Sequence, residues 1–276
     1  MRFTVLGSAG FIGRHMAAHL MHRGHEVLMP AREAASLHGV KLGHVIYAIG
    51  LTGNFRQQPQ ATIEAHVNVL QRLLEDAEFD SWLYLSSTRV YSGLSEWAEA
   101  TEFVPIPVTP GADAVYDLSK LLGEAICLGN SRRNVRVARL ANVYGVGQSQ
   151  HTFLGSIVRD VIHSGTVWIC EAPSSSKDYI ALDDAIALLE QIATDGRERI
   201  YNVASGVPVT HAALANVLRT CGYNVEFAEN GPVRSFPTID VSRIAKEFGR
   251  RMHTVTEDLP SIIKHEKEIS LERGNI

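Results

Sequence analysis

The sequence has few cysteines, no long apolar run and no excess of positive charge. Its three cysteines, Cys127, Cys170 and Cys221, lie far apart and form no CxxC pair, which argues against a disulfide framework and a cysteine zinc site. Charge or glycine breaks every apolar run before the ~18–20 residues that would span a bilayer. The 26 Lys and Arg against 30 Asp and Glu give a net charge of −4, so no overall positive field attracts nucleic acid. We therefore expect a cytoplasmic protein that binds neither nucleic acid nor membrane.

The composition is otherwise that of an ordinary globular protein. The chain has 276 residues, of which 45% are hydrophobic and 20% charged, enough for one large domain with a small lobe. Short apolar runs predict strands at 3–6, 26–29, 44–50, 82–86, 135–140 and 200–204. Amphipathic stretches predict helices at 12–23, 60–78, 116–128, 153–164 and 181–194. This alternation indicates an α/β fold with a doubly wound parallel sheet.

The chain changes character near residue 205. One helix is expected at 211–220, followed by a short extended piece near 224–228 and a proline-containing loop at 231–237. We interpret this part as a small C-terminal lobe that packs against the main domain. The twelve histidines form no cluster with supporting carboxylates, and we expect no metal site.

Three glycines, Gly7, Gly10 and Gly13, directly follow the first predicted strand and open the first predicted helix. In a dinucleotide-binding turn the first glycine permits the tight turn, the second lets a diphosphate approach the backbone, and the third lets the helix pack closely on the sheet. The free N–H groups of the helix N-terminus then face the phosphates. This context predicts that the chain binds a dinucleotide, with Phe11 and Ile12 beside the glycines.

The end of the second predicted strand distinguishes NADP from NAD. A carboxylate there would bind the ribose 2′-hydroxyl of NAD, whereas a cation would accept the 2′-phosphate of NADP. The sequence is Met29-Pro30-Ala31-Arg32, with no acid at 28–32. This pattern favours NADP held by Arg32, with NAD as the alternative and Arg14 as a second candidate cation.

Two groups of polar residues lie where a doubly wound sheet carries reactive side chains. The first is Ser86-Ser87-Thr88-Arg89-Val90-Tyr91, at the carboxyl end of a predicted strand. The second contains Tyr116 and Lys120, whose i, i+4 spacing puts both on one face of a helix. An ammonium and a bound nicotinamide ring would both lower the pKa of the tyrosine, so that it can exchange a proton with a substrate oxygen.

Taken together, these motifs resemble those of the extended short-chain dehydrogenase/reductase family, the epimerase/dehydratase group that acts on nucleotide sugars. The resemblance covers nearly the whole chain and keeps the family's order. Besides the glycine turn and the Tyr116/Lys120 pair, it includes Asn68, the segments 85–91, 139–145 and 177–180, and Tyr201-Asn202-Val203. It implies a Rossmann-type sheet with a small C-terminal α/β substrate lobe.

The resemblance also implies roles for individual residues. Tyr116 becomes the acid/base, Lys120 the residue that binds the nicotinamide ribose, and Ser87 the catalytic hydroxyl, with Thr88 in reserve and also beside the substrate. Ala48 and Ser86, near the ends of their strands, join the cofactor-binding residues. Three positions are expected to meet the substrate's diphosphate, namely Asn142, Lys177 and Arg234.

The chain also departs from the family pattern. The usual third strand with its Gly-Asp signature is not visible between Arg32 and His44. Members that eliminate water carry an acidic pair after the catalytic hydroxyl, where this chain has Thr88 and Arg89, which cannot act as general acid and base. A 4,6-dehydratase is therefore disfavoured.

The resulting hypothesis is an NADP-dependent reductase of a 4-keto sugar linked to a nucleotide. A nucleotide-sugar epimerase with tightly bound NAD(P) is the alternative, and a non-catalytic NADP-binding sensor or scaffold is the rival from another class. We expect a cofactor part at 1–145 and 178–204, and a substrate part at 146–177 and 205–276. The resemblance further implies a homodimer, in which the helices at 60–78 and from Tyr116 form a four-helix interface.

Overall fold

The main sheet of the computed structural model contains six parallel strands. The structure describes the whole chain except residues 32–36, 52–54, 112–113, 250–251, 273 and 275–276. The strand order is β10-β6-β4-β3-β1-β2. The bounds are β1 (Arg2–Leu6), β2 (Glu26–Leu28), β3 (His44–Tyr47), β4 (Ser81–Ser87), β6 (Val135–Leu140) and β10 (Ile200–Val203). Each predicted strand is present, and the predicted Rossmann-type α/β fold is confirmed.

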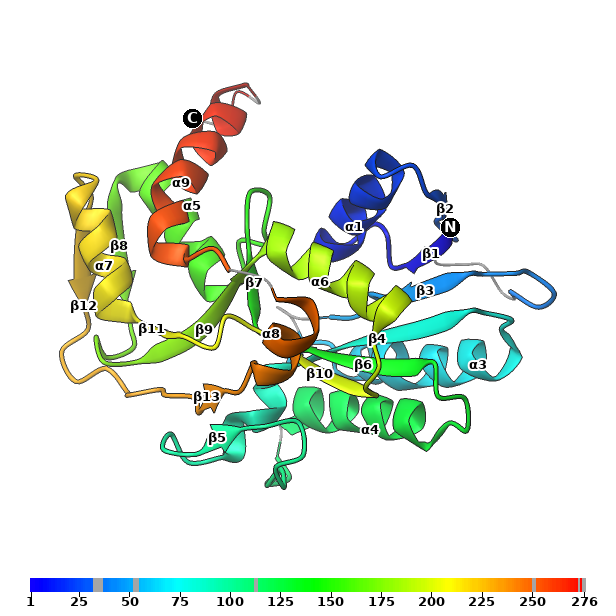
Figure 1. Ribbon diagram of the computed structural model, residues 1–276. Helices are drawn as coiled ribbons and strands as arrows, with labels where there is room; N and C mark the ends of the chain where they lie inside the picture. The colour runs from blue at the N-terminus through cyan, green and yellow to red at the C-terminus, as the bar shows by residue number, and fades with distance from the viewer. Residues whose placement is uncertain (32–36, 52–54, 112–113, 250–251, 273, 275–276) are drawn as a thin grey trace.

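Helices cover both faces of this sheet (Figure 1). On one face lie α1 (Phe11–His22) and α6 (Leu182–Asp195); on the other lie a composite helix and α4 (Val115–Gly129). The composite helix, predicted at 60–78, consists of α2 (Pro59–Ile63), the π-helical turn η1 (Glu64–Asn68) and α3 (Val69–Asp76). Two apolar cores result, one between the sheet and each helical layer.

The chain reverses its direction of strand addition at β1. After β2 pairs with one edge of β1, the chain crosses to the other edge and forms β3. Ligands of doubly wound sheets bind at such a switch point, beyond the carboxyl ends of the strands. Within the described residues β2 is the last strand on its side, as the absent Gly-Asp signature predicts.

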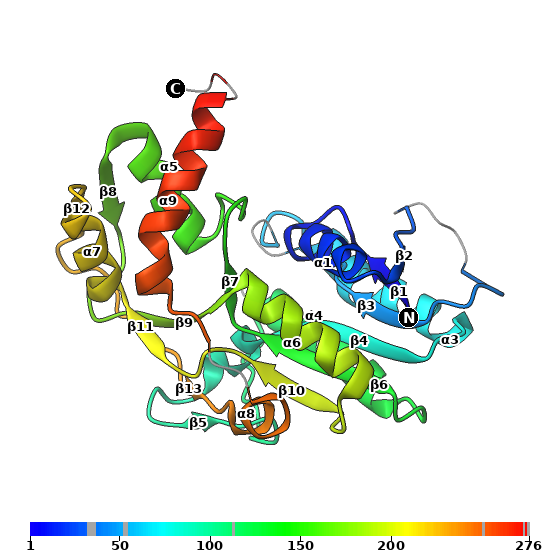
Figure 2. The same ribbon diagram turned by 45° about the horizontal axis from the view of Figure 1, so that its top comes forward.

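A second lobe lies beside the main sheet (Figure 2) and has its own apolar core. It contains the sheet of β7 (Asn142–Tyr144), β9 (Ser176–Ala181) and β11 (Pro208–Thr210), and the pair β8 (Thr166–Ile169) and β12 (Asn224–Phe227). Its helices are α5 (Phe153–Ser164), α7 (His211–Thr220) and α9 (Val255–Glu272). Below it, the short pair β5 (Glu99–Ala100) and β13 (Thr238–Ile239) precedes α8 (Ser242–Phe248). None of the helices in the described residues has both the length and the apolar character of a membrane span.

Helix α9 was not predicted, although its sequence carries a helical signal. Its buried residues Val255, Leu259, Ile262 and Ile263 have the spacing i, i+4, i+7 and i+8. Many charged residues lie between them, which makes the apolar face harder to see in the sequence, and Pro260 lies inside the helix. Packing against α5 and α7 stabilises α9 despite the proline.

A buried ion pair joins α4 to the sheet. Arg139 on β6 and Glu124 on α4 are 4% and 3% exposed, and their closest N–O distance is 2.6 Å. Ser86 Oγ donates to the same carboxylate at 2.5 Å, and the guanidinium also donates to Tyr91 Oη at 2.6 Å. Because every charge in this network has a partner, the low dielectric of the interior strengthens it.

We expect Arg139→Leu to lower the free energy of unfolding by about 3–5 kcal/mol, because it leaves the Glu124 carboxylate buried without its countercharge. Urea denaturation at pH 7 measures the change. Arg159→Leu is the matched control, since it breaks a half-exposed pair with Asp160 and should change stability by less than about 1 kcal/mol. Similar values for the two variants would contradict a stabilising role for the buried pair.

Candidate active site

The glycine turn closes tightly at the switch point. Gly7 has φ +85°, and a Cβ there would lie 2.8 Å from the backbone of Ala48. A Cβ on Gly13 would lie 2.2 Å from the carbonyl oxygen of Gly7, so α1 can pack this closely only with glycine. Gly10 is the N-cap, without a side-chain cap, and the first turn holds no acid.

This turn fits a dinucleotide diphosphate. Phe11 is the first residue of α1 and Ile12 the second, so their N–H groups precede the hydrogen-bonding pattern of the helix. The positive end of the helix dipole adds to the attraction for an anion. The predicted cofactor residues at 7–13 and Ala48 therefore lie together at the carboxyl ends of β1 and β3.

The two candidate cations for a 2′-phosphate differ in their surroundings. Arg32 lies outside the described residues, and its role stays a prediction. Arg14 donates from Nη2 to the carbonyl oxygen of Gly147 at 2.6 Å, which ties α1 to the loop after β7.

Tyr116 and Lys120 lie on the buried face of α4, next to the end of β4. The Lys120 ammonium donates to the Leu85 carbonyl oxygen at 2.8 Å. Burial lowers the pKa of Lys120 to about 7, and the Glu124 carboxylate opposes part of that shift. Ser87 ends β4 and is half-buried; its Oγ accepts from the Arg89 backbone N–H at 3.2 Å. The structure thus brings the predicted catalytic trio to one end of the sheet.

The neighbouring hydroxyls of Ser86 and Thr88 point into the protein. Ser86 Oγ is engaged by Glu124, and Thr88 Oγ1 donates to the Leu140 carbonyl oxygen at 3.3 Å. The geometry therefore favours Ser87 over Thr88 as the predicted catalytic hydroxyl.

His66 was not among the residues predicted from the sequence. It is fully buried in the π-helical turn, with its ring edge-on to Tyr116 at a centroid distance of 5.4 Å. Ser119 Oγ donates to the Tyr116 carbonyl oxygen and so accepts a bond from His66 Nδ1–H at 2.8 Å. His66 Nε2 then accepts from Leu51 N–H at 3.4 Å. Burial, aided by Lys120, lowers the pKa of His66 to about 2, so the imidazole that packs against Tyr116 is neutral near pH 7.

A cation also lies beside Tyr116. The Arg89 guanidinium is 5.7 Å from the centre of the Tyr116 ring and 5.1 Å from that of Phe55. Its Nε donates to Asp117 at 3.0 Å. Arg89 occupies one of the two positions that are acidic in dehydrating members, and a guanidinium has no proton to exchange near neutral pH.

The predicted substrate residues gather around β9. Asn142, paired with Tyr179 across the sheet, donates from Nδ2 to the Asp178 carbonyl oxygen at 2.8 Å. Lys177 and Arg234, which are far apart in sequence, lie 3.5 Å and 3.3 Å from oxygens of one carboxylate, that of Glu171. The sequence pointed to both cations and missed the carboxylate between them.

Within the described residues, no group of three or more His, Cys, Asp or Glu side chains could hold a metal ion.

Known proteins resemble this chain in sequence and in fold. The model of the NAD dependent epimerase/dehydratase family matches residues 3–204. The chain is 27% identical over 234 residues to the GDP-6-deoxy-D-mannose reductase of Pseudomonas aeruginosa, covering 74% of this chain and 75% of that one. It is 26% identical over 289 aligned positions to the dTDP-6-deoxy-L-talose 4-dehydrogenase (NAD(P)(+)) of Kitasatospora kifunensis, covering 90% of each. Among solved structures, MoeE5 in complex with UDP-glucose and NAD has a TM-score of 0.80 at 21% identity, covering 98% of this chain and all of that one.

The depressed pKa of Lys120 predicts a specific pH dependence of stability. Between the folded pKa near 7 and the ordinary lysine pKa, the unfolded chain binds more protons, so stability rises with pH. We expect Lys120→Met to be more stable than wild type at pH 6, and this difference to shrink by pH 8.5. Urea denaturation at both pH values tests this, with exposed Lys246→Met as the control. A constant difference between the two pH values would contradict the shift.

Proposed function

Because the chain belongs to the NAD dependent epimerase/dehydratase family, we propose that it is an NAD(P)-dependent oxidoreductase that reduces a keto group of a nucleotide-linked sugar, most simply at C4. The observation that supports this proposal is the convergence of Tyr116, Lys120 and Ser87 at the end of the sheet that also carries the glycine turn. The named functions of the two curated relatives, a reductase and a 4-dehydrogenase of nucleotide-linked deoxysugars, agree with it. A sensor or scaffold would have no use for this trio.

The cofactor, when bound, supplies or accepts the hydride, and the protein handles the proton. Tyr116 Oη donates its proton to the keto oxygen, and the Ser87 hydroxyl donates a hydrogen bond to the same oxygen. The Lys120 ammonium stabilises the phenolate that forms. His66 holds the Tyr116 ring at a fixed angle, so the hydroxyl keeps its position as the charge changes.

The cofactor is proposed to be NADP, because β2 ends without an acid and Arg32 follows. Residues 1–145 and 178–204 would form the cofactor part, and 146–177 with 205–276 the substrate part. In the substrate part, Asn142, Lys177 and Arg234 would hold the diphosphate. The free thiols, two of them exposed, fit the reducing conditions of a cytoplasm.

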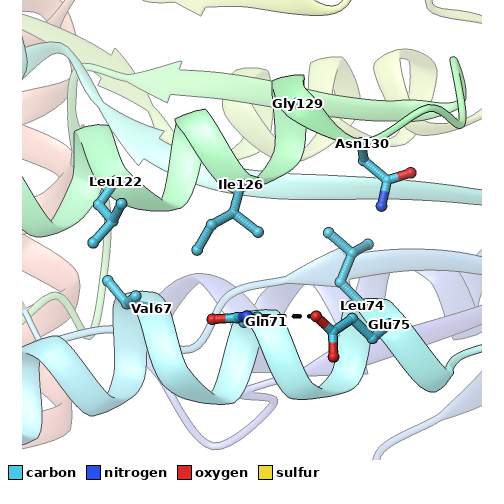
Figure 3. Close-up of a pocket in the computed structure, with 8 residues that line it drawn as sticks. All are labelled: Val67, Gln71, Leu74, Glu75, Leu122, Ile126, Gly129 and Asn130. Carbon is cyan, nitrogen blue, oxygen red and sulfur yellow. Dashed lines mark hydrogen bonds between the residues drawn. The ribbon is translucent and has the colours of Figure 1, made fainter.

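We further propose a homodimer through the composite helix and α4. A groove between them runs along the C-terminal half of α4 (Figure 3) and is lined by Val67, Gln71, Leu74, Glu75, Leu122, Ile126, Gly129 and Asn130. Leu122 is 51% exposed, and Ile63 and Leu118 are also exposed. A second copy related by two-fold symmetry would cover these apolar side chains with the same surface and make a four-helix interface.

Tyr116→Phe tests the chemistry. Turnover of a 4-keto nucleotide sugar, followed by NADPH oxidation, should fall by roughly 10²–10⁴-fold, because the proton donor is gone. Thermal stabilisation by the cofactor should persist and be larger with NADPH than with NADH. Tyr223→Phe, which removes a hydroxyl bonded to Lys267 in the other lobe, should keep wild-type turnover. Undiminished turnover in Tyr116→Phe would refute the mechanism.

Leu122→Glu tests the dimer. Light scattering should give a dimer mass for the wild type and a monomer mass for the variant, since two carboxylates would be buried in the interface. Leu271→Glu changes an exposed leucine on α9, outside the proposed interface, and should leave the dimer intact. A monomeric wild type at micromolar concentration would count against this interface.

A further inference from the structure

A carboxylate occupies the centre of the proposed diphosphate site. Glu171 lies 3.5 Å from Lys177 Nζ and 3.3 Å from Arg234 Nε. Lys177 also lies over the ring of Phe153, at 4.1 Å from its centre. The two cations on which a substrate anion would depend are thus already paired with an anion of the protein itself.

The backbone under this carboxylate is tightly held. Glu171 is in the loop between β8 and β9, where Ala172 N–H donates to the Pro232 carbonyl oxygen at 3.0 Å. A Cβ on Gly231 would lie 2.6 Å from the carbonyl oxygen of Cys170, so the two loops touch through their backbones. A change at this site therefore involves the Glu171 side chain rather than its loop.

Behind the carboxylate lie buried polar atoms that lack hydrogen-bond partners among the described residues. These are both ring nitrogens of His211, the hydroxyl of Tyr179 and Oε2 of Glu171 itself. His211 is fully buried, stacks on Phe153 at 4.1 Å, and has Nε2 3.6 Å from Glu171 Oε2. Burial, together with Lys177, lowers the pKa of His211 to about 4, so near pH 7 the ring is neutral and can donate one N–H.

The unpaired side-chain donors of His211 and Tyr179 form a second binding position for the Glu171 carboxylate. A buried polar group without a partner costs free energy. His211 Nε2 is 3.6 Å from Glu171 Oε2, and burial together with the charge of Glu171 raises the pKa of the Tyr179 hydroxyl. Rotation of the Glu171 side chain toward these two groups would give the carboxylate both donors. That rotation would withdraw the carboxylate from Lys177 and Arg234 and leave both cations to a ligand.

We propose that Glu171 is a displaceable internal anion that governs the affinity and charge selectivity of the substrate site. Without substrate it pairs with Lys177 and Arg234. A diphosphate bridges both cations and displaces the carboxylate toward His211 and Tyr179. A ligand that reaches only one cation leaves the other ion pair intact and gains less, so the site selects a nucleoside diphosphate over a monophosphate. This inference rests on the proposed function, because it assumes that the substrate carries a diphosphate.

Binding of UDP, GDP and dTDP to the full-length chain, measured by calorimetry at pH 7.5, tests the proposal. With the diphosphate that binds best, Glu171→Gln should bind about tenfold more tightly than wild type, because no ion pair has to be broken before the ligand reaches Lys177 and Arg234. The corresponding monophosphate should gain more, because in wild type it does not displace the carboxylate and binds beside a like charge. The preference for diphosphate should therefore narrow. Glu229→Gln removes the same charge at an exposed position of this lobe and should leave the affinity unchanged.

A double-mutant cycle separates displacement from simple repulsion. His211→Phe keeps an aromatic ring on Phe153 and removes the donor, so it should weaken diphosphate binding in the wild-type background and have little effect in the Glu171→Gln background. Thermal stabilisation by NADPH reports that each variant is folded. Equal diphosphate affinity in wild type and Glu171→Gln, or an equal effect of His211→Phe in both backgrounds, overturns the inference and leaves the proposed function standing. If folded wild type and Glu171→Gln bind none of the three diphosphates, the proposed substrate class is overturned, and the inference with it.

Discussion

The buried contact between Arg139 and Glu124 is the interaction on which the arrangement of the site depends. It joins β6 of the sheet to α4, the helix that carries both Tyr116 and Lys120. Through Ser86 it also reaches β4, which ends at Ser87. A charged pair excluded from water tolerates little displacement, because any separation leaves an ion unsolvated. The pair thereby fixes the positions of Tyr116 and Ser87 relative to each other.

Close backbone packing fixes the position of the glycine turn at residues 7–13. The backbone of Gly7 touches that of Ala48, and Gly13 approaches Gly7 more closely than any Cβ would allow. These contacts place the N-terminus of α1 at the switch point of the sheet, where β2 and β3 pair with opposite edges of β1. Two independent packing constraints, at β1 and at α4, therefore bring the glycine turn and Tyr116 to the same end of the sheet.

The polar side chains of the second lobe are less completely paired than those near Arg139. The ring nitrogens of buried His211 and the hydroxyl of Tyr179 have no hydrogen-bond partner among the described residues. Glu171 neutralises the two cations that the proposed substrate would need. The proposed cofactor site is thus preorganised, whereas the proposed diphosphate site must exchange one ion pair for another when its ligand binds. Such an exchange converts part of the binding energy into selectivity.

The sequence alone determined the alternation of strands and helices, the glycine turn, and the Tyr116/Lys120 pair, because each depends on residues near one another in the chain. The apolar spacing of α9 is equally local, but charged residues and Pro260 obscure it in the sequence. The position of His66 beside Tyr116 depends on the π-helical turn that contains it. In an ordinary α-helix, the residue two before Asn68 would point in a different direction. Only the tertiary structure decided that Glu171, Lys177, His211 and Arg234 share one site. Their contacts join four separate segments, and the energy of such contacts depends on burial and distance, which no local pattern encodes.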